Sequence, residues 1–83
     1  MFTVYILHSE TRKRYYIGFT GEPIESRLKK HLANHSGFTG KISDWKLVYT
    51  ENFIEKKKAM DREREIKNWK SSKMIKQLIH STE

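Results

Sequence analysis

The sequence predicts an α+β domain in which helices pack on a small, mostly antiparallel sheet. Two runs of strand-forming residues, 2–7 and 15–19, lie close to the N-terminus. The polar stretch 8–13 between them is short enough to close a β-hairpin. Apolar residues at helical spacing follow further along the chain, so the predicted order of elements is β-β-α-β-α-α. A chain of 83 residues makes one domain, residues 1–83.

The first helix follows directly from turn residues and apolar spacing. Pro23 suits the first turn of a helix, and Ile24 and Leu28 begin a helical repeat over residues 24–34. Two glycines then mark a loop at 35–44.

The C-terminal half predicts one more strand and two helices. A third strand is expected at 45–49 and a longer helix at 54–69. Ser71 or Ser72 can cap a final short helix. The apolar stripe of that helix comprises Met74, Ile75, Leu78 and Ile79.

The composition indicates a polyanionic partner. Lys and Arg number 17 against 10 Asp and Glu, which gives a formal charge of +7 and a pI near 9.8. Nucleic acid is the favoured partner, with DNA ahead of RNA, and an anionic membrane surface is a weaker second. The absence of cysteine excludes thiolate catalysis and Cys-based zinc sites. No apolar stretch approaches the roughly 20 residues of a membrane helix, so we expect a cytoplasmic protein.

Two ionisable residues lie on the apolar faces of the predicted helices. At 100° per residue, Glu63 falls within about 60° of Ala59 and Ile66, and a carboxylate there must be paired or bind a metal. A structural ion pair with Arg or Lys explains Glu63 equally well. His31 lies on the apolar arc of the first helix one turn after Arg27, so the two can address one ligand. A lone His on such a face is more often a core residue, and the neighbouring Arg27 gives it more weight.

Tyr5 and Tyr16 stand in the two predicted hairpin strands. Aromatic residues on neighbouring strands usually reflect packing, so either tyrosine alone is more easily explained as structural than as catalytic. Gly18 comes shortly after Tyr16, and a glycine inside a strand indicates close approach by another backbone or a ligand. Together with the guanidinium, imidazole and carboxylate above, the two phenols could hydrolyse a phosphodiester around one metal ion.

The C-terminal half is markedly basic. Such a run is usually a solvated face, and here it can also bind phosphates without reading the base sequence. The predicted nucleic-acid contacts are Lys41, in the loop at 35–44, and Arg62, Lys67 and Lys70.

In their order along the chain, these segments resemble the GIY-YIG nuclease superfamily, in particular its small, stand-alone bacterial members. The matching segments are Thr-Val-Tyr-Ile-Leu (3–7), Tyr-Tyr-Ile-Gly-Phe-Thr (15–20), Arg-Leu-Lys-Lys-His (27–31), Trp-Lys-Leu-Val-Tyr (45–49) and Ala-Met-Asp-Arg-Glu-Arg-Glu-Ile-Lys-Asn-Trp (59–69). Each motif is weak alone, and their common order over nearly the whole chain makes the signal strong. Thr3 and Val4 stand where the name-giving motif has Gly and Ile, whereas its tyrosine is kept.

The resemblance implies a three-stranded antiparallel sheet flanked by helices, and metal-dependent cleavage of nucleic-acid phosphodiesters. Tyr5 and Tyr16 match the two motif tyrosines, Arg27 the helix arginine, and Glu63 the metal-binding glutamate. His31 matches a histidine found in part of the superfamily. Glu63 is thus expected to hold one Mg²⁺ or Mn²⁺ ion, hard cations suited to a carboxylate with phosphate and water oxygens.

The implied one-metal mechanism gives each side chain a role. Glu63 holds the ion that polarises the scissile phosphate, and Arg27 offsets the charge of the transition state. Tyr5, assisted by His31, orients or deprotonates the attacking water, and Tyr16 hydrogen-bonds the nucleophile or the phosphate. The alternative is a nucleic-acid-binding module of this fold that does not cut. In either case specificity is expected to come from a partner protein, from a homodimer or from DNA structure.

Overall fold

The structure, a computed structural model, describes residues 1–33 and 45–81, with side chains described over 1–29 and 45–81. Its elements are β1 (Phe2–Ser9), β2 (Arg14–Thr20), α1 (Ile24–Ala33), β3 (Trp45–Phe53), α2 (Lys56–Trp69) and α3 (Ser72–His80). The predicted α+β class and the order β-β-α-β-α-α are confirmed. None of the helices described has the length and hydrophobicity needed to span a membrane.

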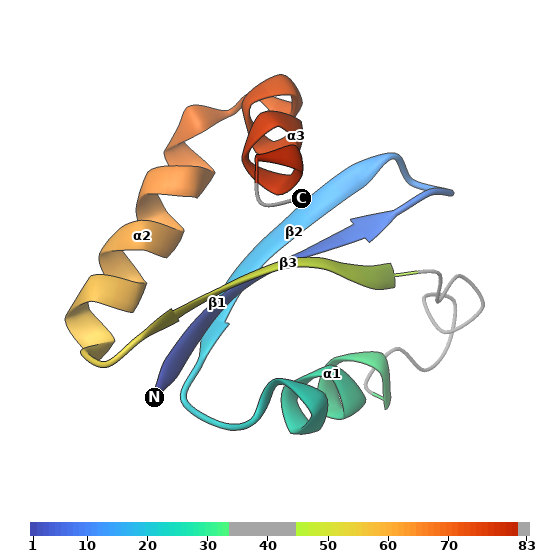
Figure 1. Cartoon of the computed structure of the whole chain (residues 1–83). Coiled ribbons are helices and arrows are strands. Elements are labelled where there is room, and N and C mark those ends of the chain that lie inside the picture. The colour runs from blue at the N-terminus through green and yellow to red at the C-terminus, as the bar shows by residue number, and fades with distance from the viewer. Residues whose placement is uncertain (34–44, 82–83) are drawn as a thin grey trace.

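The three strands form one antiparallel sheet in the order β2-β1-β3. The sheet lies between α1 on one side and α2 with α3 on the other (Figure 1). In the central strand β1, Tyr5 pairs with Gly18 of β2 and with Thr50 of β3. Residues 4–7 of β1 are fully buried, because helices cover both faces of this strand.

The main hydrophobic core lies on the face of the sheet that α2 and α3 cover. Successive side chains of a strand point to opposite faces, so Val4 and Ile6 enter this core while Tyr5 points to the side of α1. The buried members of the core are Val4, Ile6, Ile17, Tyr49, Ala59, Ile66 and Ile75. Complete burial of one such aliphatic side chain stabilises the fold by about 1.5–3 kcal/mol. This apolar layer therefore holds α2 and α3 against the sheet.

The β1–β2 hairpin is longer than its apolar pattern predicts. His8 and Ser9 continue β1 and pair with Tyr15 and Arg14. Ser9 is fully buried, and its hydroxyl accepts a hydrogen bond of 3.1 Å from the backbone N–H of Arg12. These polar residues can belong to the strand because the turn itself supplies a hydrogen-bond partner.

Two further boundaries differ from the sequence prediction. β3 continues past residue 49 to Phe53, where it pairs with Phe2 at the start of β1. The strand is longer because β1 offers a partner along its whole length. α2 begins at Lys56, two positions after the predicted start, since Glu55 at its N-cap has extended backbone angles (φ −99°, ψ 133°).

The last helix begins as predicted and differs in its apolar stripe. Ser71 is the N-cap, and its hydroxyl accepts a hydrogen bond of 3.3 Å from the backbone N–H of Met74. Ile75 is buried, and Leu78 and Ile79 pack against the core. Met74 is 43% exposed and does not belong to the buried stripe, because it is rotated by about 100° from Ile75 around the helix.

Candidate active site

Tyr5 and Gly18 form a close pair across the two hairpin strands. The Tyr5 side chain is fully buried although it ends in a hydroxyl. A Cβ atom added at Gly18 would lie 2.6 Å from the Tyr5 Oη and 2.7 Å from its Cζ, so only a glycine leaves room for this ring. The close approach that Gly18 predicted is therefore made by a neighbouring side chain.

Arg27 reaches the same phenol from α1. The backbone N–H of Arg27 donates to the Pro23 carbonyl at 3.1 Å, which places Arg27 in the first turn of the helix, over the sheet. Its Nε donates a hydrogen bond of 3.2 Å to the Tyr5 Oη. This hydrogen bond is the main reason that the pKa of Arg27 lies above its ordinary value. The guanidinium thus stays charged next to a buried phenol.

Tyr16 continues this group toward the surface. Its ring centroid lies 6.3 Å from that of Tyr5, and its side chain is 39% exposed. On its other side it meets the ring of Trp45 edge-on, with centroids 6.5 Å apart. The sequence did not single out Trp45, because an aromatic residue at the start of a strand is ordinary packing material. The structure thus brings together three of the predicted site residues, Tyr5, Arg27 and Tyr16.

A groove runs along the edge strand β2, between this strand and the junction of α2 and α3. Its volume is about 460 Å³. Tyr16 lines it together with four basic residues, Lys13 and Arg14 of the hairpin and Lys67 and Lys70 of the α2 end. The described residues that line it include no carboxylate. We call this feature the β2-edge groove, and Tyr16 links it to the Tyr5–Arg27 pair.

Glu63 lies on α2 and is half-buried, with 19% of its side chain exposed. Its Oε2 is 3.6 Å from the Nζ of Lys67, one turn later on the same helix. The ion pair that the sequence left open as an explanation is therefore present. No hydrogen bond or ion pair within the described residues joins Glu63 to Tyr5 or Arg27. Its connection to the site is through Lys67, which lines the β2-edge groove.

Two predicted site residues lie outside what the structure describes. The backbone of His31 belongs to α1, one turn after Arg27, and its side chain is outside the described part. Lys41 is outside the described residues altogether. Their assignments stay predictions.

Arg62 is tied into a network that sequence reasoning missed. Its Nε lies 3.0 Å from Glu51 Oε1 on β3, and another nitrogen lies 3.0 Å from Glu65 Oε1 on the same helix. Burial alone would lower the pKa of Arg62, and the hydrogen bonds to Glu65 and Glu51 raise it above its ordinary value. The guanidinium also lies 5.6 Å from the ring centroid of Trp69. The guanidinium N–H groups of Arg62 are already directed at the carboxylates of Glu51 and Glu65. A contact between Arg62 and nucleic acid stays a prediction.

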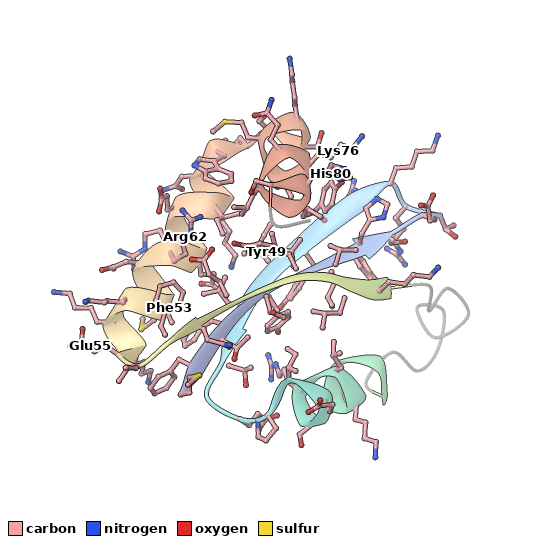
Figure 2. All side chains as sticks on the ribbon, in the orientation of Figure 1. Tyr49, Phe53, Glu55, Arg62, Lys76 and His80 are labelled. Carbon is pink, nitrogen blue, oxygen red and sulfur yellow. The ribbon has the colours of Figure 1, made fainter. Side chains whose placement is uncertain are left out.

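The same network includes a tyrosine of β3. The hydroxyl of Tyr49 donates a hydrogen bond to Glu51 Oε2. Burial, followed by this hydrogen bond, raises the pKa of Tyr49 above its ordinary value. Figure 2 shows Tyr49 and Arg62 approaching each other from β3 and α2. The signal in the sequence would have been Glu51 two residues after Tyr49, on the same face of a strand that proved longer than predicted.

The family model for the GIY-YIG catalytic domain matches residues 1–76 of the chain. The chain belongs to the GIY-YIG family. Comparison with curated proteins and with solved structures gave no significant match. The GIY-YIG family is a nuclease family, so the implied substrate is a nucleic acid.

The geometry gives a physical reason for the GIY-YIG signature in this chain. Tyr5 and Gly18 are direct partners in the β1–β2 ladder, so the glycine of one motif makes the space that the tyrosine of the other occupies. Thr3 and Val4 replace the usual Gly and Ile without disturbing the strand. Val4 is buried in the core, and the Thr3 hydroxyl hydrogen-bonds Asn52 of β3 at 2.9 Å.

GIY-YIG nucleases typically use a divalent metal, and Glu63 is a reasonable ligand for one. The described residues contain no group of three or more His, Asp and Glu side chains that could enclose an ion. Mg²⁺ does not need such a cage, because it usually binds one or two carboxylates together with water and substrate phosphate. The ammonium group of Lys67 faces the Glu63 carboxylate and would compete with a divalent ion for it, but the Lys67 side chain is 53% exposed and has room to move aside. The half-buried Glu63 carboxylate, with Lys67 displaced, therefore fits this kind of site.

Proposed function

We propose that this protein is a metal-dependent endonuclease that hydrolyses phosphodiester bonds of nucleic acid, DNA in preference to RNA. Glu63 would hold a single Mg²⁺ or Mn²⁺ ion. The supporting observations are that Arg27 donates a hydrogen bond to Tyr5, that the Tyr16 ring lies 6.3 Å from the Tyr5 ring, and that Tyr16 also lines the β2-edge groove with its four basic residues. A phosphate drawn into the groove by these cations would lie next to the Tyr16 phenol, whose ring adjoins that of Tyr5.

Each residue has a role in this proposal. Arg27 keeps its charge and offers a planar donor set suited to the extra negative charge of a phosphoryl transition state. Tyr5, held by Arg27 and Gly18, would orient or deprotonate the attacking water. Tyr16 is exposed and would hydrogen-bond the water or the phosphate. The bound ion would act as a Lewis acid on the scissile phosphate.

The test is the loss of the Glu63 carboxylate. Glu63→Gln keeps the size of the side chain and removes the charge needed to hold a divalent ion, so we expect cleavage to be abolished. Binding to nucleic acid should persist, because it depends on the basic groove. Cleavage is measured on labelled duplex, single-stranded, branched and RNA substrates with Mg²⁺, Mn²⁺ or EDTA. Cleavage by Glu63→Gln at the wild-type rate would refute the assignment.

Glu55→Gln is the matched control. Glu55 precedes α2 and pairs with Lys58 at 3.6 Å, the same separation as Glu63 and Lys67. Both substitutions remove one ion pair with a lysine of α2, and only one of them removes the proposed metal ligand. Glu55→Gln should therefore cleave at the wild-type rate.

A nucleic-acid-binding module that does not cut is the second candidate. The pairing of Glu63 with Lys67, without a hydrogen bond or ion pair to Tyr5 or Arg27 in the described part, favours it. In that case wild-type protein would bind the substrates through the β2-edge groove and cleave none of them with either metal. For both candidates, a partner protein or a second copy of the chain would select the target.

A further inference from the structure

A second cavity lies between the β1–β2 hairpin and α3, and its volume is about 630 Å³. His8 and Tyr15 line it from the hairpin, and Lys76 and His80 from α3. Figure 2 shows Lys76 and His80 on the side of α3 that faces the hairpin. We call it the hairpin–α3 cavity. Neither Tyr5 nor Arg27 lines it, so it is distinct from the candidate active site.

The hairpin–α3 cavity has an aromatic wall. His8 and Tyr15 are direct partners in the β1–β2 ladder, and their ring centroids are 4.7 Å apart with the planes tilted by 39°. Both side chains are half-buried. Burial, followed by the charge of Glu10, raises the pKa of Tyr15 above its ordinary value. A planar group can stack on this pair.

Polar groups around this wall complement a nucleotide. Lys13 and Lys76 contribute cations that can bind a phosphate, and the imidazole of His80 adds a polar side chain. Glu10 contributes a carboxylate, which can accept a hydrogen bond from the amino group of a base. An aromatic platform beside cations is the usual arrangement for binding a single-stranded nucleic acid.

The hairpin–α3 cavity adjoins the β2-edge groove. Lys13, Tyr15 and Ser72 line both of them. A strand that lies in the groove beside Tyr16 can therefore place a neighbouring nucleotide in the cavity without leaving the protein surface.

We propose that the hairpin–α3 cavity binds an unpaired nucleotide of the substrate, with its base on the His8–Tyr15 pair and its phosphate near Lys13 and Lys76. This inference rests on the proposed function and names its substrate class: a duplex with an overhang, flap or bulge. A base inside a duplex must first be unpaired and unstacked, which costs a few kcal/mol, whereas an already single-stranded base avoids most of this cost.

The experiment compares two substrates with the full chain carrying Glu63→Gln, so that binding is measured without cleavage. One is a blunt duplex, and the other is the same duplex with a single-stranded extension that begins with a fluorescent adenine analogue. Fluorescence anisotropy should show tighter binding to the extended duplex, and stacking should quench the analogue. Equal affinity for the two substrates with no quenching would overturn the proposal.

Two variants test the cavity directly. His8→Ala removes part of the aromatic wall and should weaken binding to the extended duplex by about 5- to 150-fold, which corresponds to the roughly 1–3 kcal/mol of one stacked base. Its affinity for the blunt duplex should not change. Lys76→Gln changes an exposed side chain, so the fold is preserved, and it should lower the salt dependence of binding to the extended duplex by about one counterion.

Lys58→Gln is the charge-matched control, because Lys58 is exposed near the start of α2 and lines neither the groove nor the cavity. It should behave like the parent with both substrates. The proposal would be overturned if His8→Ala and Lys76→Gln both bound the two substrates as this control does. In that case cleavage by the wild type would still support the nuclease function. A wild type that never cleaves, with the preference for the extended duplex intact, would refute the nuclease and leave the nucleotide site in place.

Discussion

Gly18→Ala is a small change that tests whether the Tyr5 position matters for both stability and activity. The added Cβ would lie 2.6 Å from the Tyr5 Oη, 2.7 Å from the Tyr5 Cζ and 3.2 Å from a ring carbon of Tyr16. Tyr5 is fully buried and accepts a hydrogen bond from Arg27, so its ring has little freedom to move away from an added methyl group. The substitution therefore has to displace the ring or the β1–β2 backbone.

The expected loss of stability follows from two opposing terms. Overpacking of a buried site typically costs about 1–3 kcal/mol. Replacing glycine with alanine restricts the unfolded chain and recovers about 0.4–1 kcal/mol. We therefore expect a net loss of roughly 0.5–2 kcal/mol, with about 4–8 °C in Tm for each kcal/mol in a domain of this size. If Tyr5 is catalytic, a displacement of about 1 Å can cost on the order of 100-fold in rate.

The assay compares Tm with the single-turnover cleavage rate. Gly21→Ala is the control, because its Cβ would meet carbons of the Phe2 ring at 3.0 and 3.3 Å, and that ring is only partly buried and can rotate. Combining Gly18→Ala with Tyr5→Phe removes the contact at 2.6 Å and keeps the one at 2.7 Å, so Tm should recover only in part and the rate should stay low. A Gly18→Ala protein with wild-type Tm and rate would refute the close packing derived from the structure.

Two further predictions separate catalysis from packing and test the network on β3. Tyr5→Phe keeps the ring and should slow single-turnover cleavage by about 10²–10⁴-fold if the hydroxyl activates water. Arg27→Lys should also slow cleavage, because lysine lacks the planar fork of the guanidinium. Wild-type rates in both variants would return these residues to a structural role. A double-mutant cycle of Arg62→Met and Glu51→Gln, measured by thermal unfolding, should give a coupling energy of about 1 kcal/mol. This value is below the roughly 1.5–3 kcal/mol of a charged hydrogen bond, because solvent reaches both side chains. A coupling near zero would contradict a stabilising role for this pair.

The hairpin was predictable in kind and only partly in detail. Two strand-like runs and a polar stretch indicated β1 and β2, and Gly18 indicated a close approach. The full length of the β1–β2 pairing was not predictable, because His8 and Ser9 continue β1 although they are polar. Burial of Ser9 is possible because its hydroxyl has a backbone partner in the turn. Such a local hydrogen bond leaves no hydrophobic signal in the sequence.

The half-burial of Glu63 followed from helical periodicity, and its ion pair with Lys67 was among the explanations left open. The contact between Arg27 and Tyr5 was expected only through the family resemblance, since spacing within one element cannot bring α1 onto β1. The pairing of Arg62 with Glu51 was missed for a similar reason. The two residues lie on different elements, and the strand that carries Glu51 extends past its predicted end.

The Arg62–Glu51 pair bears on the site although it lies outside it. Arg62 and Glu63 are consecutive on α2, so their side chains leave the helix about 100° apart. Arg62 is bound to Glu51 of β3, at one edge of the sheet. Glu63 lies on the side of α2 that carries Lys67, which lines the groove beside β2 at the opposite edge. The pair with Glu51 adds to the packing of Ala59 and Ile66 in the core, and together they restrain rotation of α2 about its axis and keep the Glu63 carboxylate on the side of the groove. A structural ion pair at one edge of the sheet thus helps to position the proposed metal ligand at the other.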